Sequence, residues 1–163
     1  MTVPIPNRQD MPEGLNEQLV RAVVDRFYAL ARKDEIIGPI FLVAVPDERW
    51  HAHLDTITDF WSSLLLGTGR YNGRPLPKHA AIAEISDAHF RRWLALFRLT
   101  AEEICPPQIA RLFIERSETI GNSFRMNIRM RRGEDLIHLK PLERETIDNR
   151  VGGSALNGAP KGR

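Results

Sequence analysis

The sequence predicts an all-α protein with one folded domain. Apolar side chains recur at helical spacing along four long segments between residues 15 and 132, and no strand pattern interrupts them. Glycines, prolines and polar N-cap residues separate these segments. A chain of 163 residues is long enough for one domain with a buried core and too short for a second full one.

The first predicted helix covers about residues 16–33. Asn16 is placed to cap its N-terminus. The apolar stripe of this helix is Leu15, Leu19, Val23, Phe27 and Leu30. Gly38 and Pro39 break the helical pattern, and Ile40 and Phe41 then fall in a short turn or helical corner.

The second predicted helix follows Asp47, which is a good N-cap residue, and stops at Gly67. Its apolar stripe is Trp50, His53, Leu54, Ile57, Phe60, Trp61, Leu64 and Leu65. Residues 67–77 contain three glycines and two prolines and therefore form a loop. This loop is not a nucleotide-binding loop, because such loops follow a strand and a helix precedes this one.

Two further helices complete the predicted domain. Ser86 caps the third, which ends at Cys105 before two prolines. The fourth begins near Pro107 and reaches about Met130. Their apolar stripes are Phe90, Trp93, Leu94, Phe97, Ala101 and Ile104 in the third helix, and Ile109, Leu112, Phe113, Ile120, Phe124 and Ile128 in the fourth.

The ends of the chain differ in composition from this helical region. Residues 1–14 are rich in proline and poor in apolar residues, so we expect a flexible arm. Residues 133–163 hold no aromatic residue, and we expect a mobile tail without apolar anchors. The predicted domain is therefore residues 15–132.

Composition excludes several classes of protein. Twenty-three Lys and Arg residues against 21 Asp and Glu give a net charge of only +2, which does not indicate a nucleic-acid partner. No signal sequence and no membrane-spanning stretch is present, so we expect a cytoplasmic protein without a membrane partner. The single cysteine, Cys105, excludes an intramolecular disulfide.

Two histidines stand out as candidates for chemistry. His53 falls on the apolar stripe of its helix, whereas His51 points about 160° away from it, so the two cannot chelate one metal. A histidine in such a stripe is more often a core residue bonded to backbone or water. His79 lies on a segment too short to be a stable helix alone; it is either an exposed loop histidine or a metal ligand.

Six motifs together resemble the truncated haemoglobins of group III over about residues 15–132. They are Phe27-Tyr28, Ile37-Gly38-Pro39-Ile40-Phe41, Trp50-His51-Ala52-His53, Phe60-Trp61, the loop Tyr71-Asn72-Gly73-Arg74-Pro75-Leu76 followed by Lys78-His79, and Arg92-Trp93-Leu94-Ala95-Leu96-Phe97. Each motif alone is weak, but their common order is specific. The resemblance implies a truncated globin-like two-over-two helical sandwich around one haem b.

The resemblance also implies roles for single residues. His79 resembles the proximal ligand of the iron, and Phe41 resembles the phenylalanine that packs on the haem face. Tyr28 and Trp93 resemble the distal groups that hydrogen-bond a diatomic ligand. His53 resembles the distal histidine that gates the pocket or contacts the ligand. Ile57, on the same stripe as His53, is placed with the cofactor-binding residues.

A function follows from these roles as an expectation. The chain is expected to bind O2, NO or CO reversibly at a five-coordinate iron, and the three distal donors favour retention, sensing or redox chemistry over bulk transport. NO dioxygenation or peroxide turnover with an unidentified reductase fits that expectation, but no residue assigns the reaction. The alternative is a cofactor-free helical module that binds a protein partner through its aromatic stripes.

Overall fold

The computed structural model describes residues 11–73 and 85–147. The regular secondary structure in these ranges is helical. The helices are α1 (Glu17–Lys33), α2 (Gly38–Ala44), α3 (Asp47–Leu66), α5 (Asp87–Ile104) and α6 (Pro107–Arg131). No strand occurs within the described ranges. The predicted all-α class is therefore confirmed.

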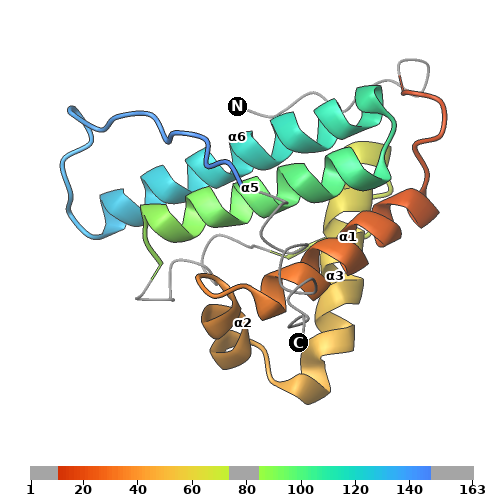
Figure 1. Ribbon diagram of the computed structural model, residues 1–163, viewed down its shortest axis with the longest axis horizontal. Helices are drawn as coiled ribbons and strands as arrows, with labels where there is room; N and C mark the ends of the chain where they lie inside the picture. The colour runs from red at the N-terminus through yellow and green to blue at the C-terminus, as the bar shows by residue number, and fades with distance from the viewer. Residues whose placement is uncertain (1–10, 74–84, 148–163) are drawn as a thin grey trace, which may run out of the picture.

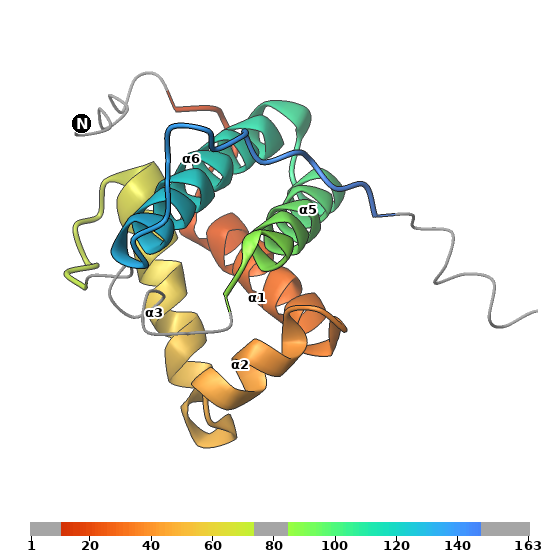
Figure 2. The same ribbon diagram turned by 90° about the vertical axis from the view of Figure 1, so that its left-hand side faces the viewer.

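The helices form two pairs. Helices α5 and α6 lie side by side and run in opposite directions across one side of the molecule (Figure 1). Helix α1 crosses α3 on the other side and also packs against α5. The short helix α2 follows the C-terminal end of α1 and leads into α3 (Figure 2). This arrangement matches the expected two-over-two sandwich.

Local sequence signals set most of the helix ends. Asn16 Oδ1 accepts a hydrogen bond from the backbone N–H of Leu19 at 2.9 Å, so the predicted cap is present. Gly67 ends α3 in the left-handed conformation, with φ at 67°. At the start of α5, the Ser86 backbone N–H donates to His89 Nδ1 at 3.0 Å. His89 thus closes this end of the helix.

One predicted cap was wrong. Asp47 is the first residue of α3 rather than its N-cap, which is Pro46. The Asp47 carboxylate turns to Arg32 at the end of α1, 2.5 Å from its guanidinium. A charged partner on a neighbouring helix thus replaces the backbone N–H groups that a cap would satisfy.

Aromatic side chains hold the two layers together. Phe27, Phe97 and Phe113 are fully buried, one each from α1, α5 and α6. The Trp61 ring of α3 stacks on Phe97, with centroids 5.0 Å apart and planes 16° apart. Full burial of one such side chain contributes about 1.5–3 kcal/mol. A smaller, separate cluster of Ile85, Phe90 and Ile128 closes the other end of α5 and α6.

The corner between α1 and α2 is tightly packed. A Cβ atom on Gly38 would lie 2.7 Å from the backbone oxygen of Arg32, so only glycine permits this approach. The buried Asp34 carboxylate accepts from the backbone N–H groups of Ile36 and Ile37. It also accepts from Arg92 Nε of α5 at 2.7 Å. This corner therefore fixes the start of α2 against α5.

The described part of the predicted tail differs from expectation, because it does have anchors. Residues 134–147 run back beside α5 and α6 (Figure 2). Leu142 packs on the smaller cluster and Ile147 on the main core. Arg98 donates to the backbone oxygen of Glu145 at 2.6 Å. Scattered single apolar residues carry no helical period, so sequence periodicity did not reveal these contacts.

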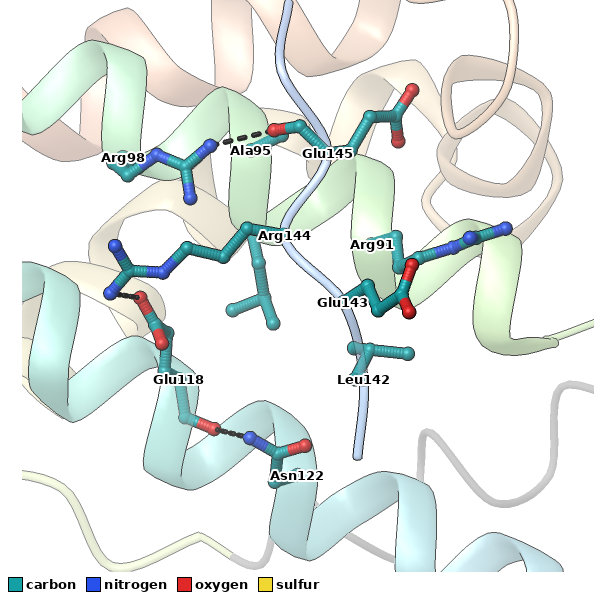
Figure 3. A pocket seen from close by; sticks show the side chains of 10 residues that line it. Arg91, Ala95, Arg98, Glu118, Asn122, Leu142, Glu143, Arg144 and Glu145 are labelled. Atoms are coloured by element: carbon teal, nitrogen blue, oxygen red, sulfur yellow. Dashed lines mark hydrogen bonds and ion pairs between the residues drawn. The ribbon is translucent and has the colours of Figure 1, made fainter. Parts of the chain in front are cut away.

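Part of this segment, together with α5 and α6, lines a small pocket (Figure 3). Most of the residues that line it are arginines and glutamates. One ion pair among them joins the guanidinium of Arg144 to the carboxylate of Glu118, 2.7 Å apart. No residue of the pocket belongs to the predicted haem-contacting set. It is therefore not the candidate site.

None of the described helices combines the length and the apolar content needed to cross a bilayer.

Candidate functional site

Tyr28 of α1 lies among three aromatic side chains, one from α2 and two from α3. The centroid of the Tyr28 ring lies 5.5 Å from that of Phe41, 5.9 Å from Trp50 and 5.6 Å from His53. All three neighbours meet Tyr28 edge to face, at interplanar angles of 70° to 89°. We call these four residues the aromatic cluster. The structure thus brings together three of the predicted site residues, Tyr28, Phe41 and His53.

Helical spacing places these side chains. Trp50, His53 and Ile57 are three and four residues apart on α3 and so share one face of that helix. Tyr28 lies in the last turns of α1, whose buried residues face α3 and α5. Helix α2 then carries Phe41 beside Tyr28. The cluster therefore forms where the ends of three helices meet.

Burial sets the chemical state of Tyr28. The residue is only 7% exposed, and its desolvation raises the pKa of the phenol well above the usual value. A phenol is already neutral at pH 7, and this burial keeps the hydroxyl protonated, with its O–H as a donor, at higher pH as well. His53 adds an imidazole whose Nε2 is buried. The cluster thus places the Tyr28 hydroxyl and the His53 imidazole, two groups able to donate hydrogen bonds, among aromatic ring faces.

Trp93 lies one ring further from the cluster. The centroid of the Trp93 ring lies 6.3 Å from that of Phe27, and the Phe27 centroid lies 4.8 Å from that of Tyr28. Trp93 is half-buried and also packs against Gly121 of α6, where a Cβ atom would lie 3.3 Å from the indole. Phe27 thus connects Trp93 to Tyr28, and the predicted distal donors sit on adjoining helices.

The other histidines separate by location. His51 is exposed, as its helical phase predicts, and His138 is exposed beside Asp135 at 2.9 Å. His79 lies outside the described residues, so its predicted role stays a prediction. Among residues 11–73 and 85–147, no three His, Cys, Asp or Glu side chains form a metal-binding group.

Sequence analysis missed two residues of this region. Trp50, which sequence analysis places only in the apolar stripe of its helix, is half-buried and contacts Phe41, Tyr28 and His53. The guanidinium of Arg32 lies over its ring, 4.1 Å from the centroid. Spacing offered part of the signal, because Trp50 precedes His53 by three residues and Arg32 follows Tyr28 by four. Their contact with each other depends on how α1 crosses α3.

The residues near the cluster fit a flat, apolar cofactor. Half-buried apolar side chains extend from the cluster along α3, at Ile57, Phe60 and Leu64. The layers meet directly further along, where Trp61 stacks on Phe97. A haem pocket requires apolar walls with a few hydrogen-bond donors on one side, and these side chains provide both.

Two crossed helix pairs with a buried phenol and an imidazole against apolar walls define a globin of the shortened kind. The chain belongs to the bacterial-like globin family, whose model matches residues 13–116. It is 32% identical over 114 residues to the group 3 truncated hemoglobin ctb of Campylobacter jejuni, a match that covers 69% of this chain and 90% of that protein. Family membership implies that the chain binds haem.

The solved structures give the same result. The crystal structure of the group III truncated hemoglobin from Campylobacter jejuni superposes with a TM-score of 0.68 at 32% identity. The match covers 72% of this chain and 94% of that one. The resemblance to group III truncated haemoglobins is therefore confirmed in both sequence and fold.

Proposed function

We propose that this globin holds haem b through His79 and retains O2, NO or CO through hydrogen bonds from Tyr28 and Trp93, with His53 either controlling ligand access or contacting the ligand. The observation that carries the proposal is the buried Tyr28 hydroxyl beside the His53 ring in an otherwise apolar aromatic cluster. The family supplies the haem, and the chain's own residues supply the pocket.

When bound, haem iron supplies the site for a diatomic ligand. The Tyr28 hydroxyl is protonated at neutral pH, burial raises its pKa further, and the O–H donates toward a ligand that carries partial negative charge. Phe41 and Ile57 keep the surroundings apolar and exclude water. His53, at the edge of the cluster, is placed to admit ligand or to donate a further hydrogen bond.

Several donors directed at one ligand favour slow release. One hydrogen bond is worth about 0.5–1.5 kcal/mol, which slows dissociation several-fold to about tenfold. Retention suits sensing or redox chemistry, such as NO dioxygenation with a reductase as electron donor, better than bulk oxygen transport.

The direct test is the absorption spectrum of the purified protein, first oxidised and then reduced under CO. We expect a ferric haem spectrum that converts to that of a single ferrous–CO form. A folded helical protein that stays colourless after addition of haem would contradict the proposal.

The test of the iron ligand is His79→Gly. Because one imidazole holds the iron, the variant should lose haem, or should regain a wild-type spectrum on addition of free imidazole. His89→Gly is the matched control, since His89 closes a helix end and lies outside the cluster. Full haem content and an unchanged ferrous–CO spectrum in His79→Gly would show that another residue binds the iron.

A further inference from the structure

Arg32 and Trp50 make a contact that the proposed function does not use. The Arg32 guanidinium carbon lies 4.1 Å from the centroid of the Trp50 ring, within the range of a cation–π interaction. Arg32 comes from the last turn of α1 and Trp50 from the first turns of α3. Asp47, also in the first turn of α3, pairs with the same guanidinium. Arg32 therefore joins two helix ends at the outer side of the aromatic cluster.

Trp50 passes this contact on to His53. The two rings lie 5.7 Å apart at an angle of 34°, the most nearly parallel pair in the cluster. Trp50 also meets Tyr28 and Phe41 edge to face. A displacement of the indole would therefore open the space beside His53 and remove one of the rings that pack on it.

We propose that Arg32 and Trp50 form a clamp that positions His53 and so limits the rate at which a diatomic ligand reaches the pocket. The inference rests on the proposed function, since it assigns residues that control access to the same site. Trp50 is a positioning residue in this account. Arg32 acts through Trp50 and does not itself meet the ligand.

The cation–π contact, rather than the ion pair, carries the clamp. The Asp47 side chain is 86% exposed, so water screens its attraction to Arg32. Arg32 is 28% exposed and its guanidinium carbon lies over the Trp50 ring, a position that a planar guanidinium, able to stack on an aromatic face, fills better than the compact ammonium of lysine. Removal of Asp47 should therefore matter less than removal of the guanidinium.

The experiment measures CO association after flash photolysis of the haem-loaded protein. Arg32→Met keeps the length of the side chain and removes the cation, and Trp50→Leu removes the ring. We expect both variants to bind CO about three- to tenfold faster, since loss of a cation–π contact is of that magnitude. The double variant should be no faster than Trp50→Leu, because both changes open one clamp.

Control variants separate the clamp from general loosening. Arg26→Met removes an arginine of the same helix that pairs with exposed Glu103 at 3.5 Å, and Asp47→Asn removes the ion pair alone. Both should bind CO within about twofold of the wild-type rate. Arg32→Lys should bind CO faster than wild type, and it carries the test if Arg32→Met does not hold haem.

A second measurement does not depend on ligand rates. In the CO-saturated protein, the His53 ring protons experience the ring current of Trp50. Their NMR chemical shifts therefore report the contact between the two rings. Arg32→Met and Arg32→Lys should both move these shifts toward their values in Trp50→Leu, and Arg26→Met should not.

Each result decides the proposal. Faster CO association together with moved His53 shifts supports it. Three results would overturn it while the haem assignment stands. They are CO association rates in the Arg32 and Trp50 variants that are slower than wild type or within 1.5-fold of it, unchanged His53 chemical shifts, and an equal increase in the CO association rate of Arg26→Met. A chain that binds no haem would overturn this inference and the proposed function together.

Discussion

In the proposed function, Tyr28 acts through one hydroxyl group. The phenol is buried among Phe27, Phe41, Trp50 and His53, and this burial raises its pKa, so the hydroxyl remains a neutral donor well above pH 7. The ring fills space in the same cluster, so removing the whole side chain would mix two effects. Removing the oxygen alone separates polarity from packing.

We expect Tyr28→Phe to release O2 faster, by about three- to tenfold, and to oxidise faster in air, because one hydrogen bond to the ligand is lost. Stopped-flow O2 displacement measures the release rate. Trp93→Phe should act in the same direction. The Tyr28→Phe/Trp93→Phe double variant should show less than the product of the single effects if both groups address one ligand. Unchanged release in both single variants would contradict the hydrogen-bonding role of these residues.

His53→Leu provides the matched contrast among the site residues. Leucine keeps the apolar packing with Trp50 and Tyr28 but cannot donate a hydrogen bond. If His53 mainly controls access, CO association should change by more than about threefold while O2 release stays within about twofold. A larger change in release than in association would instead make His53 a third donor to the ligand.

At the scale of elements, the corner between α1 and α2 decides where Phe41 lies. Gly38 approaches the backbone of Arg32 so closely that a methyl group has no room. The neighbouring Asp34 binds backbone N–H groups of the corner and Arg92 of α5. The start of α2 is thus held from both sides, and Phe41 follows three residues later.

We expect Gly38→Ala to destabilise the protein by about 1–3 kcal/mol, because the added Cβ must displace backbone rather than a flexible side chain. Urea unfolding measures the change. Gly69→Ala is the control: its φ is 70°, and nothing lies within 4 Å of the added Cβ, so it should lose only about 1 kcal/mol. Equal losses in the two variants would show that the approach at Gly38 is not tight.

The C-terminal segment is the second element whose role can be measured. Truncation after Gly133 removes the packing of Leu142 and Ile147 and the backbone oxygens that Arg98 and Arg125 bind. We expect a loss of about 2–4 kcal/mol in urea unfolding, with full haem content, because no residue of 134–147 belongs to the aromatic cluster.

Truncation after Ile147 keeps all of these contacts and is the matched control. It should unfold at the wild-type urea concentration. A Gly133 truncation of unchanged stability would show that the contacts of residues 134–147 contribute nothing net, and loss of haem from it would show that the segment completes the pocket.

At the scale of the whole molecule, one ion network joins the start of α5 to the end of α6. Arg125, only 6% exposed, donates two hydrogen bonds to the Asp87 carboxylate at 2.8 and 3.0 Å. Arg129 adds a contact at 2.5 Å. The hydrogen bond from Arg125 is the main reason that the pKa of Asp87 falls to about 2.

This lowered pKa makes stability depend on pH in a definite window. A carboxylate whose folded pKa is below its unfolded value stabilises the fold above about pH 4, and that contribution is lost as the pH falls toward 2. Because Asp87 is 30% exposed, we expect about 1–2 kcal/mol rather than the full value of the shift.

Asp87→Asn tests this contribution. The stability difference between wild type and the variant should be constant from pH 7 to 5 and shrink between pH 4 and 2, as measured by urea unfolding. Asp135→Asn, which changes an exposed pair with His138, is the control and should have a smaller effect at every pH. A difference that is independent of pH would contradict the low pKa of Asp87.

Local sequence determined the helices and much of the site's chemistry. Asn16, Gly67 and Ser86 mark helix ends by their own hydrogen bonds or backbone conformation, so they could be predicted from neighbours in the chain. Helical phase likewise separated His53 from His51, and family motifs added Tyr28 and Phe41. These features can be predicted from the sequence because each depends on residues only a few positions apart in the chain.

Only the tertiary structure decided what meets across helices. Asp47 pairs with Arg32 instead of capping its helix, and Arg32 lies over the Trp50 ring. Arg125 is buried in its ion pair with Asp87. Residues 134–147 found single apolar contacts on a helix pair formed earlier in the chain. Such contacts depend on the crossing of α1 over α3 and of α5 beside α6, and no local period or propensity encodes the geometry of a crossing.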